Sequence, residues 1–212
     1  MRIDLWSDLV CPWCAIGKAH LDKALLAFEH ADDVTVLWRS FELDPGAPAV
    51  RDGTYSSQLA RRYGTSPQGG SAMVGRISAA AERAGVQARF DLVRPANTFD
   101  AHRLLHLAKE RGVQDRLACR LTEAYLAEGE LLSDHATLQR LAGEAGLTEG
   151  VEATLSSGAY RDHVRADEAE AARQGISAVP TLLVDERHVI PGAQSPESML
   201  ATLRRAWSRH FQ

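Results

Sequence analysis

Strand patterns occur only near the two ends of this chain of 212 residues. Residues 1–7 alternate apolar and polar side chains, and residues 34–38 (Val-Thr-Val-Leu-Trp) are apolar and β-branched. From Cys11 to Phe28 the apolar residues recur instead at helical spacing. A strand, a helix and a strand in this order and of this length predict two parallel strands joined by a right-handed crossover.

The C-terminal end has a different pattern. Residues 180–184 and 188–190 are strand-like, and the short polar run 185–187 between them predicts a hairpin. Ser195 and Pro196 then supply an N-cap and a first helical residue for a terminal helix. The order at this end is therefore strand, strand, helix.

Between these two ends, from about residue 56 to residue 174, no convincing strand pattern appears. Helices are expected from about Thr98, from about Gln114, and after Asp134 as an N-cap. Gly64–Gly75 holds four glycines and one proline, which predicts a mobile loop between helices. It does not predict a phosphate cradle, because no strand precedes it.

We therefore predict an α/β fold in which one unit is split by a helical insertion. Residues 1–43 and 175–212 form the α/β unit, residues 44–174 form the insertion, and a helix near 159–174 bridges back. The chain has no internal repeat and no long linker, which favours an insertion over two tandem domains.

Composition excludes several classes. With 45% hydrophobic residues the chain is neither disordered nor collagen-like. Its 24 basic and 28 acidic residues include no basic run, so nucleic acid is not an expected partner.

No apolar stretch approaches the roughly 18 residues that span a bilayer, so no membrane association is expected. The patterned segment directly after Met1 leaves no room for a signal peptide, which predicts a cytoplasmic protein. Lysine supplies only three of the basic residues, which suggests a GC-rich bacterial genome.

Cys11-Pro12-Trp13-Cys14 stands where a strand gives way to a helix. The unpaired N–H groups of a helix N-terminus stabilise an adjacent thiolate, typically by about 0.3 to 1 kcal/mol. Cys11 is therefore the candidate nucleophile. Cys14 follows one turn later and can attack a mixed disulfide on Cys11.

The alternatives for the two cysteines are a chance pair of buried thiols or half of a zinc site, but Cys119 and the scattered histidines do not complete a zinc motif. Cys119 is expected to be an inert buried thiol.

These motifs resemble the DsbA-like thioredoxin superfamily, closest to its FrnE-like branch. The resemblance rests on the cysteine motif, on Gly175–Thr181 (GISAVPT), on Gly192–Gln194 (GAQ) and on the helices between them. Residues 97–104 (NTFDAHRL) are similar to a segment of FrnE-like proteins, of 2-hydroxychromene-2-carboxylate isomerases and of kappa-class glutathione transferases. The last two families typically have Ser in place of Cys11.

The resemblance implies a thioredoxin fold and a cis peptide at Val179–Pro180 that faces the cysteines. The free backbone groups of Val179 would then pair with an extended substrate or with glutathione. The implied substrate-binding residues are Pro12, Trp13, Val179, Pro180 and His102. Trp13 departs from DsbA, in which a histidine helps to stabilise the thiolate, and Asp8 would oppose the thiolate if it lies close. A weaker oxidant than DsbA is therefore expected.

Other polar residues have two possible interpretations. Asp4 is either a buried proton relay for Cys14 or, as strand alternation favours, a solvent-facing side chain. Lys18 either attracts an anion or belongs to a solvated helix face, and Asp8 is either near the thiolate or a solvated loop carboxylate. His102 and Arg103 are candidates for lining a groove beside the insertion, with a structural histidine as the alternative.

Together these features favour a thiol-disulfide oxidoreductase or isomerase that acts on protein or peptide thiols and disulfides. No tightly bound cofactor and no metal are expected, and glutathione is a candidate redox partner. A glutathione-dependent isomerase or transferase is the alternative, and a zinc-binding or chaperone-like module is a third hypothesis. Both a monomer and a homodimer are compatible with the sequence.

Overall fold

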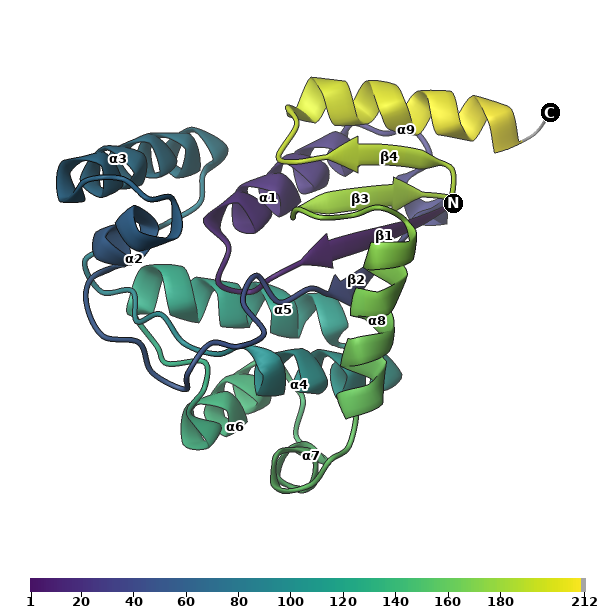
Figure 1. Cartoon of the computed structure of the whole chain (residues 1–212). Coiled ribbons are helices and arrows are strands. Elements are labelled where there is room, and N and C mark those ends of the chain that lie inside the picture. The colour runs from purple at the N-terminus through teal and green to yellow at the C-terminus, as the bar shows by residue number, and fades with distance from the viewer. Residues whose placement is uncertain (211–212) are drawn as a thin grey trace.

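Four strands form one mixed sheet in the computed structural model, which describes residues 1–210 (Figure 1). In the order β2-β1-β3-β4, the strands are β2 (Thr35–Ser40), β1 (Arg2–Ser7), β3 (Thr181–Val184) and β4 (His188–Pro191). β1 is parallel to β2 and antiparallel to β3, and β3 is antiparallel to β4. The parallel pair and the hairpin predicted from the sequence are therefore confirmed. The last two residues of the predicted α/β unit, 211–212, lie outside the described residues.

Helices follow the predicted order. The α/β unit contributes α1 (Pro12–Leu26), a 3₁₀ turn η1 (Ala31–Asp33) and α9 (Pro196–His210). The segment between β2 and β3 contributes α2 (Tyr55–Arg62), α3 (Pro67–Ala84), α4 (Phe99–Glu110), α5 (Gln114–Glu123), a π-helical turn η2 (Ala124–Glu128), α6 (His135–Glu144), α7 (Val151–Ser156) and α8 (Arg161–Arg173). The Asp134 N-cap is confirmed, since its carboxylate accepts the N–H of Thr137 at 2.8 Å. In Figure 1, α8 crosses in front of the sheet, whereas α1 and α9 lie on its other side.

The expectation that Asp4 faces solvent is wrong. The side chain is 1% exposed because α8 covers the face of β1 opposite to Leu5. Trp6 lies on the same covered face, and its indole N–H donates to the backbone carbonyl of Asp167 in α8 at 3.1 Å. Strand alternation correctly separates the two faces, but both faces are buried here.

An arginine neutralises this buried face. Arg39 of β2 donates to the carboxylate of Asp4 at 2.7 Å and to that of Asp167 at 3.0 Å. Burial opposes ionisation of Asp167, but hydrogen bonds from His106 and from the N–H of Ser40, together with the charge of Arg39, lower its pKa. Arg39 thus joins β1, β2 and α8 through two buried carboxylates.

The predicted loop at Gly64–Gly75 is also wrong, because α3 begins at Pro67. Ser66 is its N-cap and accepts the N–H of Gly69 at 3.1 Å. A Cβ at Gly70 would lie 2.3 Å from the carbonyl oxygen of Ser56 in α2. The glycine therefore permits close contact between α2 and α3, and the Ser-Pro start was the overlooked helix signal.

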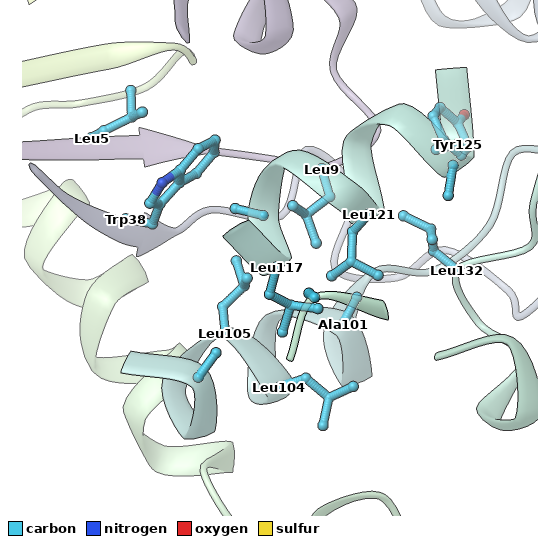
Figure 2. Close-up of a cluster of buried hydrophobic side chains, with 14 of the residues drawn as sticks. Leu5, Leu9, Trp38, Ala101, Leu104, Leu105, Leu117, Leu121, Tyr125 and Leu132 are labelled. Carbon is cyan, nitrogen blue, oxygen red and sulfur yellow. The ribbon is translucent and has the colours of Figure 1, made fainter. Parts of the chain in front are cut away.

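One hydrophobic cluster extends from the sheet into the insertion. Figure 2 shows Trp38 of β2 and Leu9 beside the leucines of α5, with α4 beneath them. Leu117 and Leu121 of α5 are fully buried at this junction. The helices of the predicted insertion therefore share a hydrophobic core with the sheet.

Candidate functional site

Cys11 lies at the N-terminal end of α1. It has the extended conformation of an N-cap residue, and Pro12 takes the first helical position, where its missing N–H has no intrahelical partner. The N–H of Cys11 donates to the carbonyl of Asp8 at 3.1 Å, which fixes the turn between β1 and α1. The expected strand-to-helix placement of the motif is confirmed.

The two cysteines differ in access. Both are free thiols with little exposure, but Cys11 lines a cavity whereas Cys14 lies behind it. Burial, followed by a hydrogen bond with Cys11 and the charge of Cys11, raises the pKa of Cys14 well above its ordinary value. Cys14 therefore remains protonated while Cys11 is accessible.

The Val179–Pro180 peptide bond is cis, as the resemblance implied. The carbonyl oxygen of Val179 lies 3.9 Å from the sulfur of Cys11. The Pro180 ring packs on α1 at Gly17, where a Cβ would lie 2.8 Å from a ring carbon. Gly17 is thus a positioning residue that the sequence did not reveal, since only the fold brings it to Pro180.

Replacing Gly17 by alanine is expected to destabilise the protein by about 1 to 3 kcal/mol, because the proline ring cannot move aside as a flexible side chain would. Gly75→Ala in α3 is the matched control. Nothing lies within 4 Å of its Cβ position, so this change is expected to stabilise by up to about 1 kcal/mol. Urea unfolding of both variants measures the difference. Equal effects of the two substitutions would show that the Pro180 contact is not tight.

The cavity beside Cys11 has a volume of about 690 Å³. Of the predicted substrate-binding residues, Pro12, Trp13 and Val179 line it. The Trp13 side chain is 42% exposed at this site. Helices α2 and α3 form another part of the wall, and Figure 1 shows them beside the N-terminal end of α1. From these helices and the segments near them come Arg51, Tyr55, Leu59, Arg61, Arg62, Met73, Arg76 and Ile77.

His102 does not line this cavity. It is completely buried, with Nε2 3.4 Å from a carboxylate oxygen of Asp8, yet neither ring nitrogen makes a hydrogen bond of acceptable geometry with the described residues. Asp8 is also buried, and its carboxylate accepts the N–H of Leu43 at 2.8 Å, so of the two alternatives for this residue the solvated loop carboxylate is wrong. Burial raises the pKa of the neighbouring Glu42, while Arg165 and His102 act in the opposite direction.

Two further sequence interpretations change. Arg103 is buried away from the groove, and its guanidinium donates to the carbonyls of Ala159 and Ser157 at 2.7 and 2.6 Å. Lys18 is 8% exposed and pairs with Asp22 at 2.8 Å, so it does not lie on a solvated helix face.

Cys119 is exposed rather than buried, because it lies on the outer side of α5. Its sulfur nevertheless sits in a second cavity of about 350 Å³ together with Lys18. Desolvation there raises the pKa of Cys119 to about 11, although the charge of Lys18 opposes the shift. A thiol with this pKa is a poor nucleophile at neutral pH.

The sequence also gave no indication of the arginines on α2 and α3, because they lie some 50 residues or more from Cys11 along the chain. Within residues 1–210 no group of three or more His, Cys, Asp or Glu side chains is arranged to hold a metal ion. Among the described helices, none is both long and apolar enough to cross a membrane.

Comparison with known proteins gives three findings. The DSBA-like thioredoxin domain family matches residues 2–204. The uncharacterized protein YwbO of Bacillus subtilis (strain 168) is 31% identical over 196 residues, which are 91% of this chain and 90% of YwbO. The crystal structure of a probable DsbA oxidoreductase from Streptomyces coelicolor has a TM-score of 0.92 and 41% identity, covering 98% of this chain and 90% of that one.

More distant structures share the fold alone. The cytosolic disulfide reductase DsbM from Pseudomonas aeruginosa, in its structure with GSH, has a TM-score of 0.68 and 18% identity, covering 98% of this chain and 100% of that one.

Proposed function

Because the chain belongs to the DSBA-like thioredoxin domain family, we propose that it is a thiol-disulfide oxidoreductase in which Cys11 attacks and Cys14 resolves. Its fold is the thioredoxin-like fold of DsbA with a helical insertion, as the sequence predicted. Within this family we assign it to the FrnE-like branch, because of residues 97–104 and the intact cysteine pair.

The observation that supports these roles best is the difference between the two thiols. Cys11 lines the cavity, whereas Cys14 is buried behind it with a raised pKa. A substrate in the cavity therefore meets the Cys11 sulfur. Burial is the main cause of the raised pKa of Cys14, and the hydrogen bond and charge of Cys11 add to it, so the pKa of Cys14 is expected to fall when Cys11 enters a mixed disulfide.

In the reducing direction, the Cys11 thiolate attacks one sulfur of a substrate disulfide and the other substrate sulfur leaves as a thiolate. Cys14 then loses its proton and attacks the Cys11 sulfur, which releases the second substrate thiolate. Two electrons pass to the substrate, and the Cys11–Cys14 disulfide remains. A second reductant must then return the protein to its dithiol form.

We propose glutathione, or protein and peptide thiols, as redox partners. The DsbM structure with GSH supports a glutathione site in a protein of similar fold. In this chain the carbonyl of Val179 lies beside the Cys11 sulfur, and the exposed indole of Trp13 lies at the same cavity. Both groups can contact the backbone of an extended substrate with little side-chain selectivity.

We also propose a cytoplasmic location, in which a moderately oxidising pair is mostly reduced and acts in disulfide reduction or isomerisation. Trp13 supplies no charge to Cys11, which supports a weaker oxidant than DsbA. The direction of electron flow then follows from the reduction potential.

A redox titration tests the proposal. In glutathione or dithiothreitol buffers, the protein is expected to show one two-electron transition between about −280 and −120 mV, read by alkylation gel shift. Cys119→Ser is the control and is expected to keep the same midpoint, whereas Cys11→Ser is expected to show no transition. A wild-type protein without a transition would refute the proposal. Glutathione-dependent turnover of an aromatic substrate that survives in Cys11→Ser would instead favour an isomerase or transferase.

A further inference from the structure

Positive charge gathers at the cavity beside Cys11. Its wall contains four arginines (Arg51, Arg61, Arg62 and Arg76) and two aspartates (Asp8 and Asp44). The whole chain, in contrast, carries a formal net charge of −4. The cavity therefore has a local charge opposite to that of the protein, which general basicity cannot explain.

Two of these arginines are free to bind a ligand. Arg51 pairs with Asp44, and Arg61 donates to the carbonyl of Asp52 at 3.0 Å. Arg62, near the end of α2, and Arg76 of α3 are both exposed, and neither has an ion pair or a side-chain hydrogen bond with the described residues. The two aspartates of the cavity form hydrogen bonds or ion pairs within the protein, whereas these two guanidinium groups form none with the described residues.

Tyr55 lines the cavity together with Cys11 and Arg62. Burial, followed by the charge of Cys11, raises the pKa of Tyr55, whereas the charge of Arg62 acts in the opposite direction. The Tyr55 side chain therefore lies within electrostatic reach of both Cys11 and Arg62. Cys11, Tyr55 and Arg62 all line one cavity, so a ligand that contacts Arg62 occupies the same cavity as the reactive sulfur.

Apolar side chains of α2 and α3 also contribute to the cavity wall. Leu59, Met73 and Ile77 line the same cavity as the two exposed arginines, and Gln58 of α2 is a polar member of this wall. A ligand that fits this lining combines an uncharged portion with anionic groups. Guanidinium groups bind carboxylates with paired, charge-assisted hydrogen bonds, so carboxylates are the matching anions.

We propose that Arg62 and Arg76 select disulfide substrates that carry carboxylates close to the reacting cysteine. The proposal rests on the thiol-disulfide exchange proposed above and specifies its substrate class. The arginines act in capture of the substrate and not in sulfur transfer. Their removal therefore raises KM and leaves kcat nearly unchanged.

Two sources can supply this chemistry: a small thiol of the glutathione type and an acidic segment of a protein. Matched octapeptides with one cysteine, linked to 2-mercaptoethanol and flanked by Glu or by Gln, represent the second source. Glutathione disulfide represents the first, and hydroxyethyl disulfide is the neutral reference. Whichever carboxylate-bearing substrate depends on the arginines identifies the source.

The experiment compares wild type, Arg62→Gln/Arg76→Gln and Arg83→Gln, with dithiothreitol as the electron donor that returns the Cys11–Cys14 disulfide to the dithiol. Arg83→Gln changes an exposed arginine of α3 outside the cavity wall. For a carboxylate-bearing substrate, the double variant is expected to lose about tenfold in kcat/KM. The Gln peptide and hydroxyethyl disulfide are expected to change less than about twofold, and Arg83→Gln is expected to behave as wild type. Added salt is expected to weaken the wild-type preference for carboxylates, because exposed charges are screened.

The failures are distinguishable. One outcome refutes the substrate class alone. Wild type would turn over hydroxyethyl disulfide and would have the same kcat/KM for the Glu and Gln peptides, and the double substitution would not change kcat/KM for glutathione disulfide. The exchange reaction would then stand, and the proposed preference for carboxylates would be wrong. If the double variant retains the full preference for carboxylates, the two arginines are not its source. If wild type turns over none of the disulfides, the proposed function itself fails.

Discussion

Replacing Cys14 by serine is expected to stop the reaction halfway and leave the protein covalently linked to its substrate. Cys11 still attacks a disulfide from the cavity, but no thiol lies behind it to release the product. Turnover is expected to fall by about 10³-fold or more, as when a nucleophile is removed from an enzyme. Cys11→Ser is expected to lose as much turnover and to form no mixed disulfide.

Incubation with a peptide disulfide, acid quenching and intact-mass measurement distinguish the two variants. Cys14→Ser is expected to gain the mass of one peptide thiol, and dithiothreitol is expected to remove it. Cys119→Ser serves as the control, because its thiol has a pKa of about 11 and lies in a different cavity. A mixed disulfide found in Cys11→Ser, at Cys14, would reverse the proposed roles.

Replacing Arg39 by methionine is expected to lower the free energy of unfolding by about 3 kcal/mol at pH 7, because it leaves two buried carboxylates without their shared cation. Asp4 and Asp167 are 1% and 5% exposed, whereas the Arg39 side chain is 23% exposed. That exposure places the expected loss at the lower end of the range for buried pairs. Urea unfolding measures it.

Arg2→Met is a matched control, since Arg2 donates to the same Asp4 carboxylate at 2.7 Å but is 43% exposed. It is expected to lose no more than about 1 kcal/mol. A loss from Arg2→Met as large as that from Arg39→Met would show that burial does not set the strength of these contacts.

The effect of Arg39 should depend on pH. The folded-state pKa of Asp167 is lowered, so its stabilising contribution is present above its unfolded pKa of about 3.9 and is lost as the pH falls through the lower folded value. The deficit of Arg39→Met is therefore full at neutral pH. It is expected to shrink below about pH 4, where protonation removes the Asp167 charge that Arg39 balances.

The helical insertion gives this protein both its cavity and its second buried layer. Helices α2 and α3 supply the arginine side of the cavity, whereas α8 covers the sheet face that carries Asp4. The same segment thus contributes to the proposed substrate selection and to the expected loss in the free energy of unfolding of Arg39→Met. A shortened insertion would be expected to affect both properties.

Local signals in the chain were sufficient for the fold class and for the two cysteines. Periodicity of two or about 3.6 residues depends on near neighbours, and the cysteine motif places both sulfurs within one helical turn, so no distant contact is needed to recognise them. Pro180 was identified through the resemblance, which the cis peptide bond confirms.

Contacts between distant segments decided what the local signals could not. Asp4 is buried because α8, more than 150 residues later, covers its strand face, and Gly17 is small because Pro180 packs on it. The arginines of α2 and α3 reach the cavity only because α3 packs on α1 and α2 packs on α3. Burial and electrostatic environment depend on which segments come together, so the sequence by itself determined the elements and the reactive pair, and the tertiary structure decided their surroundings.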